Sequence, residues 1–286
     1  MKLSSTQLEA FYAVAKNRSF TKAAQEIHIS QSALSQRILN LEIETQTTLF
    51  LRDRSGIELT EAAQELLKYC QMSEQFEAQF LGRLKGNSKD LVGVARIAGF
   101  SSIMRSIILP SLKAILLAHP QVQLQMVTKE LHELLPTLKR GEVDFIILDH
   151  KLERDELEVI PLGTERYILI EPKNYRGPEV YLDHDEKDEI TKKYLKFLKK
   201  PSANIKRHFL DDIYGVIDGV KLGLGRAVVP EHLSYGMKGI DIKNSKTSLE
   251  IPLYLHFYKQ PFYTHLHEVL IQNLVKECSH LLRPIA

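Results

Sequence analysis

Apolar side chains in the first 58 residues recur at intervals of three and four, which is the spacing of one buried helix face. Ser19 and Ser30 stand where helix caps are expected. Because only His28 and Ile29 connect the last two helices, the pair is typical of a helix-turn-helix. The predicted helices are Thr6–Asn17, Thr21–His28 and Gln31 to about Glu44. The side chains expected to be buried in the third helix are Ala33, Leu34, Ile38 and Leu41.

A small β-hairpin is predicted directly after these helices. Two short apolar runs, Leu49-Phe50 and Ile57-Glu58-Leu59, flank the polar segment Asp53–Gly56. Arg52 and Arg54 lie near the tip of this hairpin. A hairpin in this place is a wing, so residues 1–58 are expected to form a winged helix-turn-helix domain.

Residues 59–86 form one long helical stretch without proline, which Thr60 can cap and Gly86 can end. Six of eight positions in a heptad-like seam along it are apolar. A lone helix with such a stripe needs a partner, so a dimerising linker helix over 59–87 is favoured. The alternative is a helix packed on its own domain. The seam consists of Leu59, Ala63, Leu66, Cys70, Ser73, Glu77, Phe80 and Leu84.

From Leu91 onward, strand-like and helix-like runs alternate, which predicts an α/β domain with a parallel sheet. The strand-like runs are Leu91–Ile97, Val122–Val127, Asp144–Leu148, Tyr167–Ile170, Arg226–Val229 and Leu253–Tyr258. The helix-like runs are Ser102–Ala118, Leu131–Arg140, Ile190–Lys199, Asp212–Leu222 and Thr264–Leu282.

Composition narrows the class of protein. The chain has 286 residues, of which 44% are hydrophobic and 26% charged, which is ordinary for a soluble globular protein. Two cysteines cannot form a disulfide framework and suggest a reducing compartment. The best apolar stretch, Ser106–Ala118, is interrupted by Pro110 and Lys113, and the first residues do not resemble a secretory signal. We therefore expect a cytoplasmic protein that does not enter a membrane.

The third predicted helix carries the chemistry of a DNA-reading helix, because amide, hydroxyl and guanidinium groups can reach base edges in the major groove. Arg52 and Arg54 of the wing could enter the minor groove or contact phosphates. Residues 1–58 hold seven Lys/Arg and six Asp/Glu, a net charge of only +1. A helical module that binds another protein is therefore the alternative. The candidate DNA-binding residues of the helix are Gln31, Ser32, Ser35, Gln36, Arg37 and Asn40.

Six short motifs follow one another across about sixty residues: Leu8-Glu9-Ala10-Phe11, Ser19-Phe20-Thr21-Lys22-Ala23-Ala24, Ile29-Ser30-Gln31-Ser32-Ala33-Leu34-Ser35, Leu41-Glu42, Leu49-Phe50-Leu51-Arg52 and Leu59-Thr60-Glu61-Ala62. In these motifs the chain resembles the LysR-type transcriptional regulators. Weaker motifs extend it to the rest of the chain: Leu109-Pro110, Gly141-Glu142-Val143-Asp144, Leu224-Gly225 and Val228-Val229-Pro230.

The resemblance implies a winged helix-turn-helix, a dimerising linker helix and a two-lobed effector domain similar to type 2 periplasmic binding proteins. It places the effector domain at 88–286, with lobe I at 88–161 and 262–286 and lobe II at 162–261. The expected function is sequence-specific binding to promoter DNA as a homodimer or a dimer of dimers. A small-molecule effector in the inter-lobe cleft would control it, and RNA polymerase is a further expected partner if the protein is an activator.

Three positions depart from the family pattern. Ser35-Gln36-Arg37 has an order that resembles the regulators of lysine and arginine export. Thr45-Gln46 replaces the Leu-Gly that usually ends this helix, so the turn lacks its glycine. Ala63 stands where glycine is usual.

An effector site is expected beyond the carboxyl ends of the strands, where helix N-termini offer free amides. Ser101 and Ser102 suit a carboxylate, although simple capping of their helix is the alternative. Asp149 would favour an amine-bearing ligand such as an amino acid if it faces the cleft, and an organic acid is the other ligand class considered. The full candidate set is Gly99, Phe100, Ser101, Ser102, Thr128, Asp149, Gly225 and Arg226.

Other functions find little support in the sequence. An α/β enzyme would need a nucleophile elbow, a phosphate loop or a dinucleotide fingerprint, and none of these motifs occurs. No cofactor or metal site is expected, because Asp183-x-Asp185-x-x-Asp188 has Lys187 at a ligand position of a calcium loop. The lysines of 192–200 form a basic helix face that could touch flanking DNA but is more simply a solvated surface.

Overall fold

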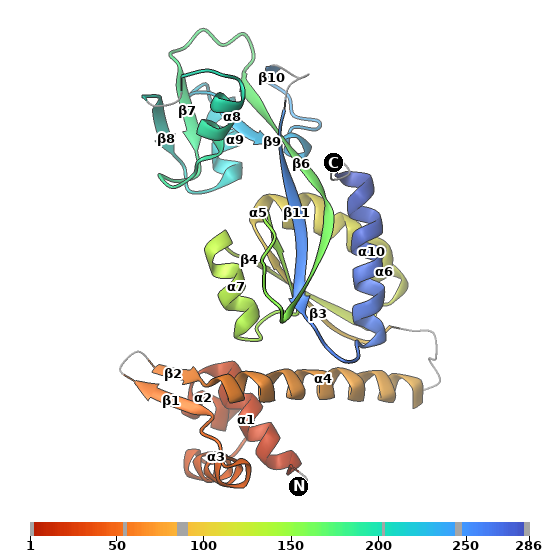
Figure 1. The fold of residues 1–286 in the computed structure, drawn as a ribbon. Helices are drawn as coiled ribbons and strands as arrows, with labels where there is room; N and C mark the ends of the chain where they lie inside the picture. The colour runs from red at the N-terminus through yellow and green to blue at the C-terminus, as the bar shows by residue number, and fades with distance from the viewer. Residues whose placement is uncertain (1–2, 54–55, 85–90, 202–203, 244–247, 283–286) are drawn as a thin grey trace.

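The computed structural model describes residues 3–53, 56–84, 91–201, 204–243 and 248–282. Its N-terminal part contains the three predicted helices and the predicted hairpin (Figure 1). Phe50 closes their common core, with its ring centroid 5.4 Å from that of Phe11 and 5.8 Å from that of Phe20. The elements are α1 (Ser5–Asn17), α2 (Phe20–Glu26), α3 (Gln31–Thr45), β1 (Phe50–Asp53) and β2 (Gly56–Leu59).

The predicted long helix is present as α4 (Glu61–Leu84), but its faces are used differently from the predicted seam. Ala63 and Cys70 are buried in the core of the N-terminal domain together with Leu67, so the first half of the seam packs within its own chain. Phe80 of the predicted seam is exposed, on one face with Tyr69 and Phe76, which the seam did not include. The predicted seam therefore does not run along one free face, because α4 has to close the small core of the domain before it can contact a partner.

The C-terminal part is an α/β structure, but its main sheet is mixed rather than parallel. The strand order is β10-β6-β11-β5-β3-β4, with β9 also paired to β6. Only β3 pairs in parallel, with β4 and β5, whereas every pairing of β6 and β11 is antiparallel. The strands are β3 (Gly93–Gly99), β4 (Val122–Thr128), β5 (Phe145–Leu148), β6 (Leu157–Pro172), β9 (Ala227–Pro230), β10 (Ile240–Lys243) and β11 (Leu249–Tyr258). A separate parallel pair is formed by β7 (Val180–Asp183) and β8 (Lys206–Phe209).

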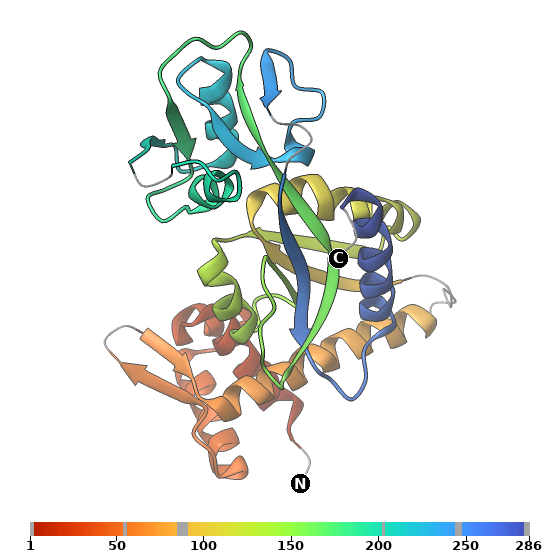
Figure 2. The same cartoon turned by 45° about the horizontal axis from the view of Figure 1, so that its top comes forward.

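The long strands β6 and β11 run side by side from one lobe into the other (Figures 1 and 2). Their register shifts between Leu253 and Tyr254, opposite Gly163, whose φ of 142° few other residues adopt. Tyr254 already pairs with β5 of lobe I. We therefore move the lobe boundary expected at 261/262 into β11.

Helices cover both lobes and complete their cores. In lobe I the stretch 101–118 is α5 (Ser101–Ile103), a π-helical turn (Met104–Ile108) and α6 (Leu109–Ala118) in succession. This stretch is apolar and long enough to cross a membrane, yet 44% of it is buried and its inner face joins the lobe I core. Its composition is thus explained by packing. The remaining helices are α7 (Leu131–Lys139) and α10 (His265–Leu281) in lobe I and α8 (Ile190–Phe197), α9 (Ile213–Lys221) and the 3-10 turn Glu231–Leu233 in lobe II.

Candidate nucleic-acid interface and ligand cleft

The apolar side of helix α3 packs into the core of the N-terminal domain, so its polar side faces outward. Leu34, Ile38 and Leu41 are buried against α1 and α2. Ser30 caps the helix, because its hydroxyl accepts a hydrogen bond from the amide of Ala33 (3.1 Å). Ala33 itself is exposed, contrary to the prediction, since the cap places it on the outer side of the first turn.

The outer face of α3 brings together most of the candidate DNA-binding residues. Gln31, Ser32, Gln36 and Asn40 are all exposed on it. The Gln36 amide donates a hydrogen bond to the Asn40 side chain (2.9 Å), which holds the two amides as one unit of donors and acceptors. Such side chains can read base edges when a helix enters the major groove.

The other candidates lie at the margin of this face or beyond the described residues. Ser35 and Arg37 are half-buried, and Arg37 faces α1, where its guanidinium lies 3.7 Å from the Glu9 carboxylate. Arg52 belongs to β1, but its side chain lies outside the described part of the chain, as does the whole of Arg54.

Sequence reasoning missed some groups on the same surface. Thr21 and Lys22 are exposed at the start of α2, where the Ser19 hydroxyl accepts a hydrogen bond from the Lys22 amide (3.3 Å). The exposed Lys22 ammonium carries a charge that suits a phosphate. Leu39 and Ile43 are also exposed, at 48% and 64%, on the outer face of α3. The Ser-x-x-Lys pattern could have pointed to Lys22 from the sequence.

The ends of the lobe I strands bring together the residues expected to form one wall of a ligand cleft. Gly99 and Thr128 are direct partners at the ends of β3 and β4. The next residues are Phe100, which begins α5, and Ser101 and Ser102, of which Ser102 is buried. Phe100 occupies the N-cap position and no side chain there makes a capping hydrogen bond, so neither serine caps the helix. Asp149 follows β5 and lies 2.7 Å from the ring of His150.

The opposite wall comes from lobe II and touches lobe I at two places. The His184 ring lies 3.7 Å from the Glu130 carboxylate. The Arg105 guanidinium lies over the Tyr214 ring, 4.3 Å from its centre. These two contacts bring described side chains of the two lobes together.

Acidic groups gather where β6 enters lobe II. Glu165 is buried and accepts hydrogen bonds from the Tyr167 hydroxyl (2.8 Å) and the His232 ring (2.7 Å). Burial raises the pKa of Tyr167 well above its usual value, and the nearby charges of Glu165 and Asp149 raise it further. Glu165 is thus already paired within lobe II, and Asp149 is paired with its neighbour His150.

Comparison with known proteins decides the family. The family described as the LysR family of bacterial regulatory helix-turn-helix proteins matches residues 5–64, and the LysR substrate binding domain matches residues 88–278. The chain belongs to the LysR family. The expected fold is thereby confirmed: a helix-turn-helix domain joined to a LysR substrate-binding domain.

Relatives of this LysR-family chain support the same fold. The uncharacterized HTH-type transcriptional regulator YcgK of Bacillus subtilis is 32% identical over 165 residues, which cover 56% of this chain and 49% of YcgK. The chain thus spans about half the length of the curated relatives it matches.

Solved structures of full-length relatives match nearly all of the chain. The crystal structure of ArgP from Mycobacterium tuberculosis has a TM-score of 0.78 at 20% identity, covering 99% of this chain and 100% of ArgP. LysG from Corynebacterium glutamicum, with bound effector Arg, has a TM-score of 0.75 at 19% identity and the same coverage.

Two of the candidate ligand residues of the LysR-family chain lie away from the cleft. Gly225 and Arg226 precede β9, and its antiparallel pairing puts Ala227 beside Ile170 and Pro230 beside Tyr167. The start of β9 is thus the end remote from the lobe crossing. There the Arg226 guanidinium lies 3.8 Å from Glu171 and 3.4 Å from Glu179. Because β9 runs antiparallel to β6, its last residue and not its first lies nearer the lobe crossing. We therefore leave both residues out of the proposed site.

Metal and thiol chemistry find no support in the described part of this LysR-family chain. Among those residues no group of three or more His, Cys, Asp or Glu could hold a metal ion. Burial raises the pKa of the Cys70 thiol to about 12 and that of Cys278 to about 11, so neither is a ready thiolate at neutral pH.

Proposed function

We propose that the chain is a transcriptional regulator that binds promoter DNA sequence-specifically, without catalytic activity, in the cytoplasm. The exposed amide face of α3 carries this proposal, because Gln36 and Asn40 stand on a helix whose opposite side is locked into the domain core. Gln31 and Ser32 extend the face toward the start of the helix, the part that enters the major groove in helix-turn-helix proteins.

The test is binding to the DNA beside the gene of this protein, with random DNA as competitor, at two salt concentrations. Gln36→Ala should weaken specific binding by about 1–3 kcal/mol and leave binding to random DNA unchanged. Lys22→Ala should weaken binding to both DNAs and reduce the salt dependence. Gln272→Ala, an exposed glutamine on α10, is the matched control and should change neither.

Equal losses on specific and random DNA for Gln36→Ala would contradict base reading by α3. Failure of the unmodified chain to retain any fragment would favour the alternative, a helical module that binds a protein.

The proposed assembly is a homodimer or a dimer of dimers. Tyr69, Phe76 and Phe80 lie on one exposed face of α4, separate from the face that closes the domain core. Aromatic side chains that recur at this spacing on an exposed helix suit a second helix of the same kind.

The proposed ligand is an amine-bearing small molecule, such as a basic amino acid, bound between the lobes. Asp149, which follows β5 next to the ends of β3 and β4, supports a cationic ligand group. The structural relative LysG with bound arginine supports the same class. Ser101 and Ser102 at the helix start suit the carboxylate of such a ligand.

Calorimetric titration with L-arginine and L-lysine tests this class of ligand. Asp149→Asn should weaken binding by roughly tenfold or more, whereas Asp155→Asn, an exposed residue of a lobe I loop, should not. Unchanged affinity in Asp149→Asn would remove Asp149 from the site.

A further inference from the structure

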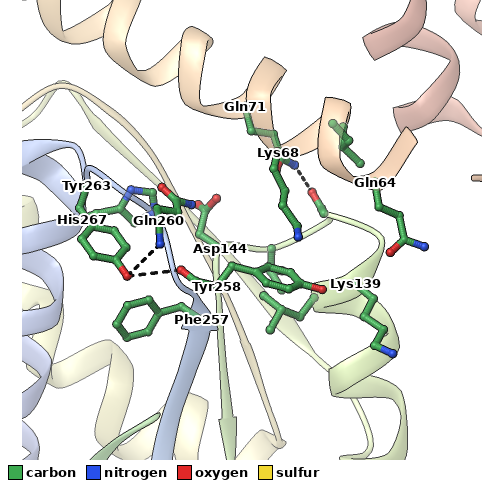
Figure 3. A pocket seen from close by; sticks show the side chains of 14 residues that line it. Gln64, Lys68, Gln71, Lys139, Asp144, Phe257, Tyr258, Gln260, Tyr263 and His267 are labelled. Carbon is green, nitrogen blue, oxygen red and sulfur yellow. Dashed lines mark hydrogen bonds between the residues drawn. The ribbon is translucent and has the colours of Figure 1, made fainter. Parts of the chain in front are cut away.

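Lobe I lies directly along α4 of its own chain (Figures 1 and 3). The contact is made by the turn that joins α7 to β5, which contains the motif Gly141-Glu142-Val143-Asp144. Neither the outer face of α3 nor the ligand cleft uses this motif. The role of this motif must therefore lie in the contact with α4.

The turn rests on α4 through its backbone. Gln71 of α4 donates a hydrogen bond to the carbonyl of Gly141 (Figure 3). Gly141 has a φ of +66°, and a Cβ there would lie 2.8 Å from both Gln71 Nε2 and Leu67 Cδ2. One turn away, the Lys68 ammonium lies 3.8 Å from the centre of the Tyr258 ring. An alanine at 141 would thus displace the Gln71 and Leu67 side chains that form this contact, and its backbone would be strained.

A chain of polar groups continues the contact into the N-terminal domain. The Tyr12 hydroxyl of α1 donates to the Glu74 carboxylate of α4 (2.9 Å). The same carboxylate lies 3.6 Å from the guanidinium of Arg96 on β3. Asp144 accepts a hydrogen bond from the Arg96 amide (3.0 Å). Four residues therefore tie the DNA-binding domain, the linker helix and lobe I together.

Polar and charged groups line the contact between α4 and lobe I. Arg96 Nη1 is buried without a hydrogen bond, 3.9 Å from Asp144. Burial raises the pKa of Asp144 to about 6, against the lowering effect of Arg96. The glutamine and lysine side chains Gln64, Lys139 and Gln260 line a small recess in the same contact. Polar interfaces of this kind between parts of one chain are typical of parts that move.

We propose that the Gly141–Asp144 turn is a releasable latch by which lobe I fixes the orientation of the DNA-binding domain of its own chain. This inference rests on the proposed function, because it gives the latch a role in DNA binding. The latch face of α4, with Gln64, Lys68 and Gln71, is distinct from the aromatic face with Tyr69, Phe76 and Phe80. A closed latch and a dimer can therefore exist together.

Hydrogen exchange on the full chain tests the docking without DNA. Gly141→Ala and Glu74→Gln should each speed exchange at residues 64–74 and 139–144 by roughly tenfold. Gly223→Ala is the matched control, because Gly223 also has a positive φ (+83°) but has nothing within 4 Å of an added Cβ. It carries the same backbone strain without touching α4. Exchange in both latch variants that equals the control would overturn the latch.

DNA affinity tests what the latch does. Both latch variants should bind the promoter fragment several-fold more weakly than Gly223→Ala, because a freed domain loses more orientational freedom on binding. If both latch variants exchange hydrogen faster but bind the promoter fragment as tightly as Gly223→Ala, the latch has no role in DNA binding. If the unmodified chain binds no fragment, the proposed function fails, while the exchange comparison still decides whether lobe I docks on α4.

Discussion

Gln46 ends α3 in a backbone conformation that suits glycine. Its φ is 52°, and its amide donates to the carbonyl of Ile43 (3.2 Å). A Cβ in this left-handed conformation costs about 1 kcal/mol. Gln46→Gly should therefore raise the free energy of unfolding by about 0.5–1 kcal/mol, measured by urea denaturation. Gln272→Gly, within α10, should lower it by a similar amount. A loss of stability in Gln46→Gly would contradict the assignment of strain to this residue.

His256 makes the stability of lobe I depend on pH. Its buried ring accepts a hydrogen bond from the Leu152 amide (3.1 Å), and burial lowers its pKa to about 4. Because this pKa lies below that of the unfolded chain, His256 contributes stability above pH 6.5, and the contribution is lost as the pH falls toward 4.

The variant His256→Gln keeps an acceptor and removes the titration. Between about pH 7.5 and about pH 5 the unmodified chain should lose about 2 kcal/mol more stability than the variant. Urea denaturation at the two pH values measures this difference. His267, whose pKa burial also lowers to about 4, is present in both proteins and cancels. An equal pH dependence in the two proteins would show that His256 does not titrate as stated.

Single residues were predictable where their role is local. Ser19 and Ser30 cap their helices as expected, because a cap depends only on the next three residues. The surroundings of Arg37 were not predictable, because its partner Glu9 lies on another helix. Glu165 was missed for the same reason, since its partner His232 is 67 positions away in the chain.

At the scale of elements, α4 carries two separate contact faces and one free face. Phe76 and Phe80 are 40% and 59% exposed on the free face. Replacing both with alanine should weaken the dimer by roughly tenfold to a hundredfold, because each ring buries apolar area against the partner helix. Sedimentation over a range of concentrations measures this change.

The control for this pair is Phe197→Ala, another exposed phenylalanine, which lies on α8. It should leave the association unchanged. A dimer of unaltered strength in the Phe76/Phe80 variant would place the subunit contact elsewhere on the chain.

Long periodic elements were predictable and short polar strands were not. The helices of the N-terminal domain and α4 stand out because apolar positions repeat over several turns. The strand β8 has the sequence Lys-Arg-His-Phe, in which nothing alternates, and it was missed together with β7 and β10. Of β6 only Tyr167–Ile170 was predicted, so the part of this strand that crosses from lobe I also escaped the prediction.

At the scale of the whole molecule, the two lobes are joined only through β6 and β11 among the described strands. Gly163 lies where the register shifts, with a φ of 142°. Gly163→Ala should lower the free energy of unfolding by about 1–2 kcal/mol, because alanine cannot adopt this φ without strain. Urea denaturation followed by circular dichroism measures the loss, and unchanged stability would show that the crossing does not require this conformation.

Strand direction decides which of the expected ligand residues lie close together. Gly99, Thr128 and Asp149 were predictable as neighbours, because parallel strands end at the same edge. The direction of β9 depends on its antiparallel pairing with β6, which no local pattern reveals, so the place of Arg226 at the end remote from the lobe crossing could not be predicted. The mixed sheet escaped prediction for the same reason.

The order of the strands also sets the order in which the protein can form during synthesis. The N-terminal core closes with the first half of α4, so this domain can fold while the rest of the chain is still being made. Lobe I cannot, because β11 lies between its strands β5 and β6, and α10 supplies part of its core. Both follow lobe II in the chain. Most of lobe II is therefore translated before lobe I is complete, and β5 leaves the ribosome while its neighbour β11 is still to be translated.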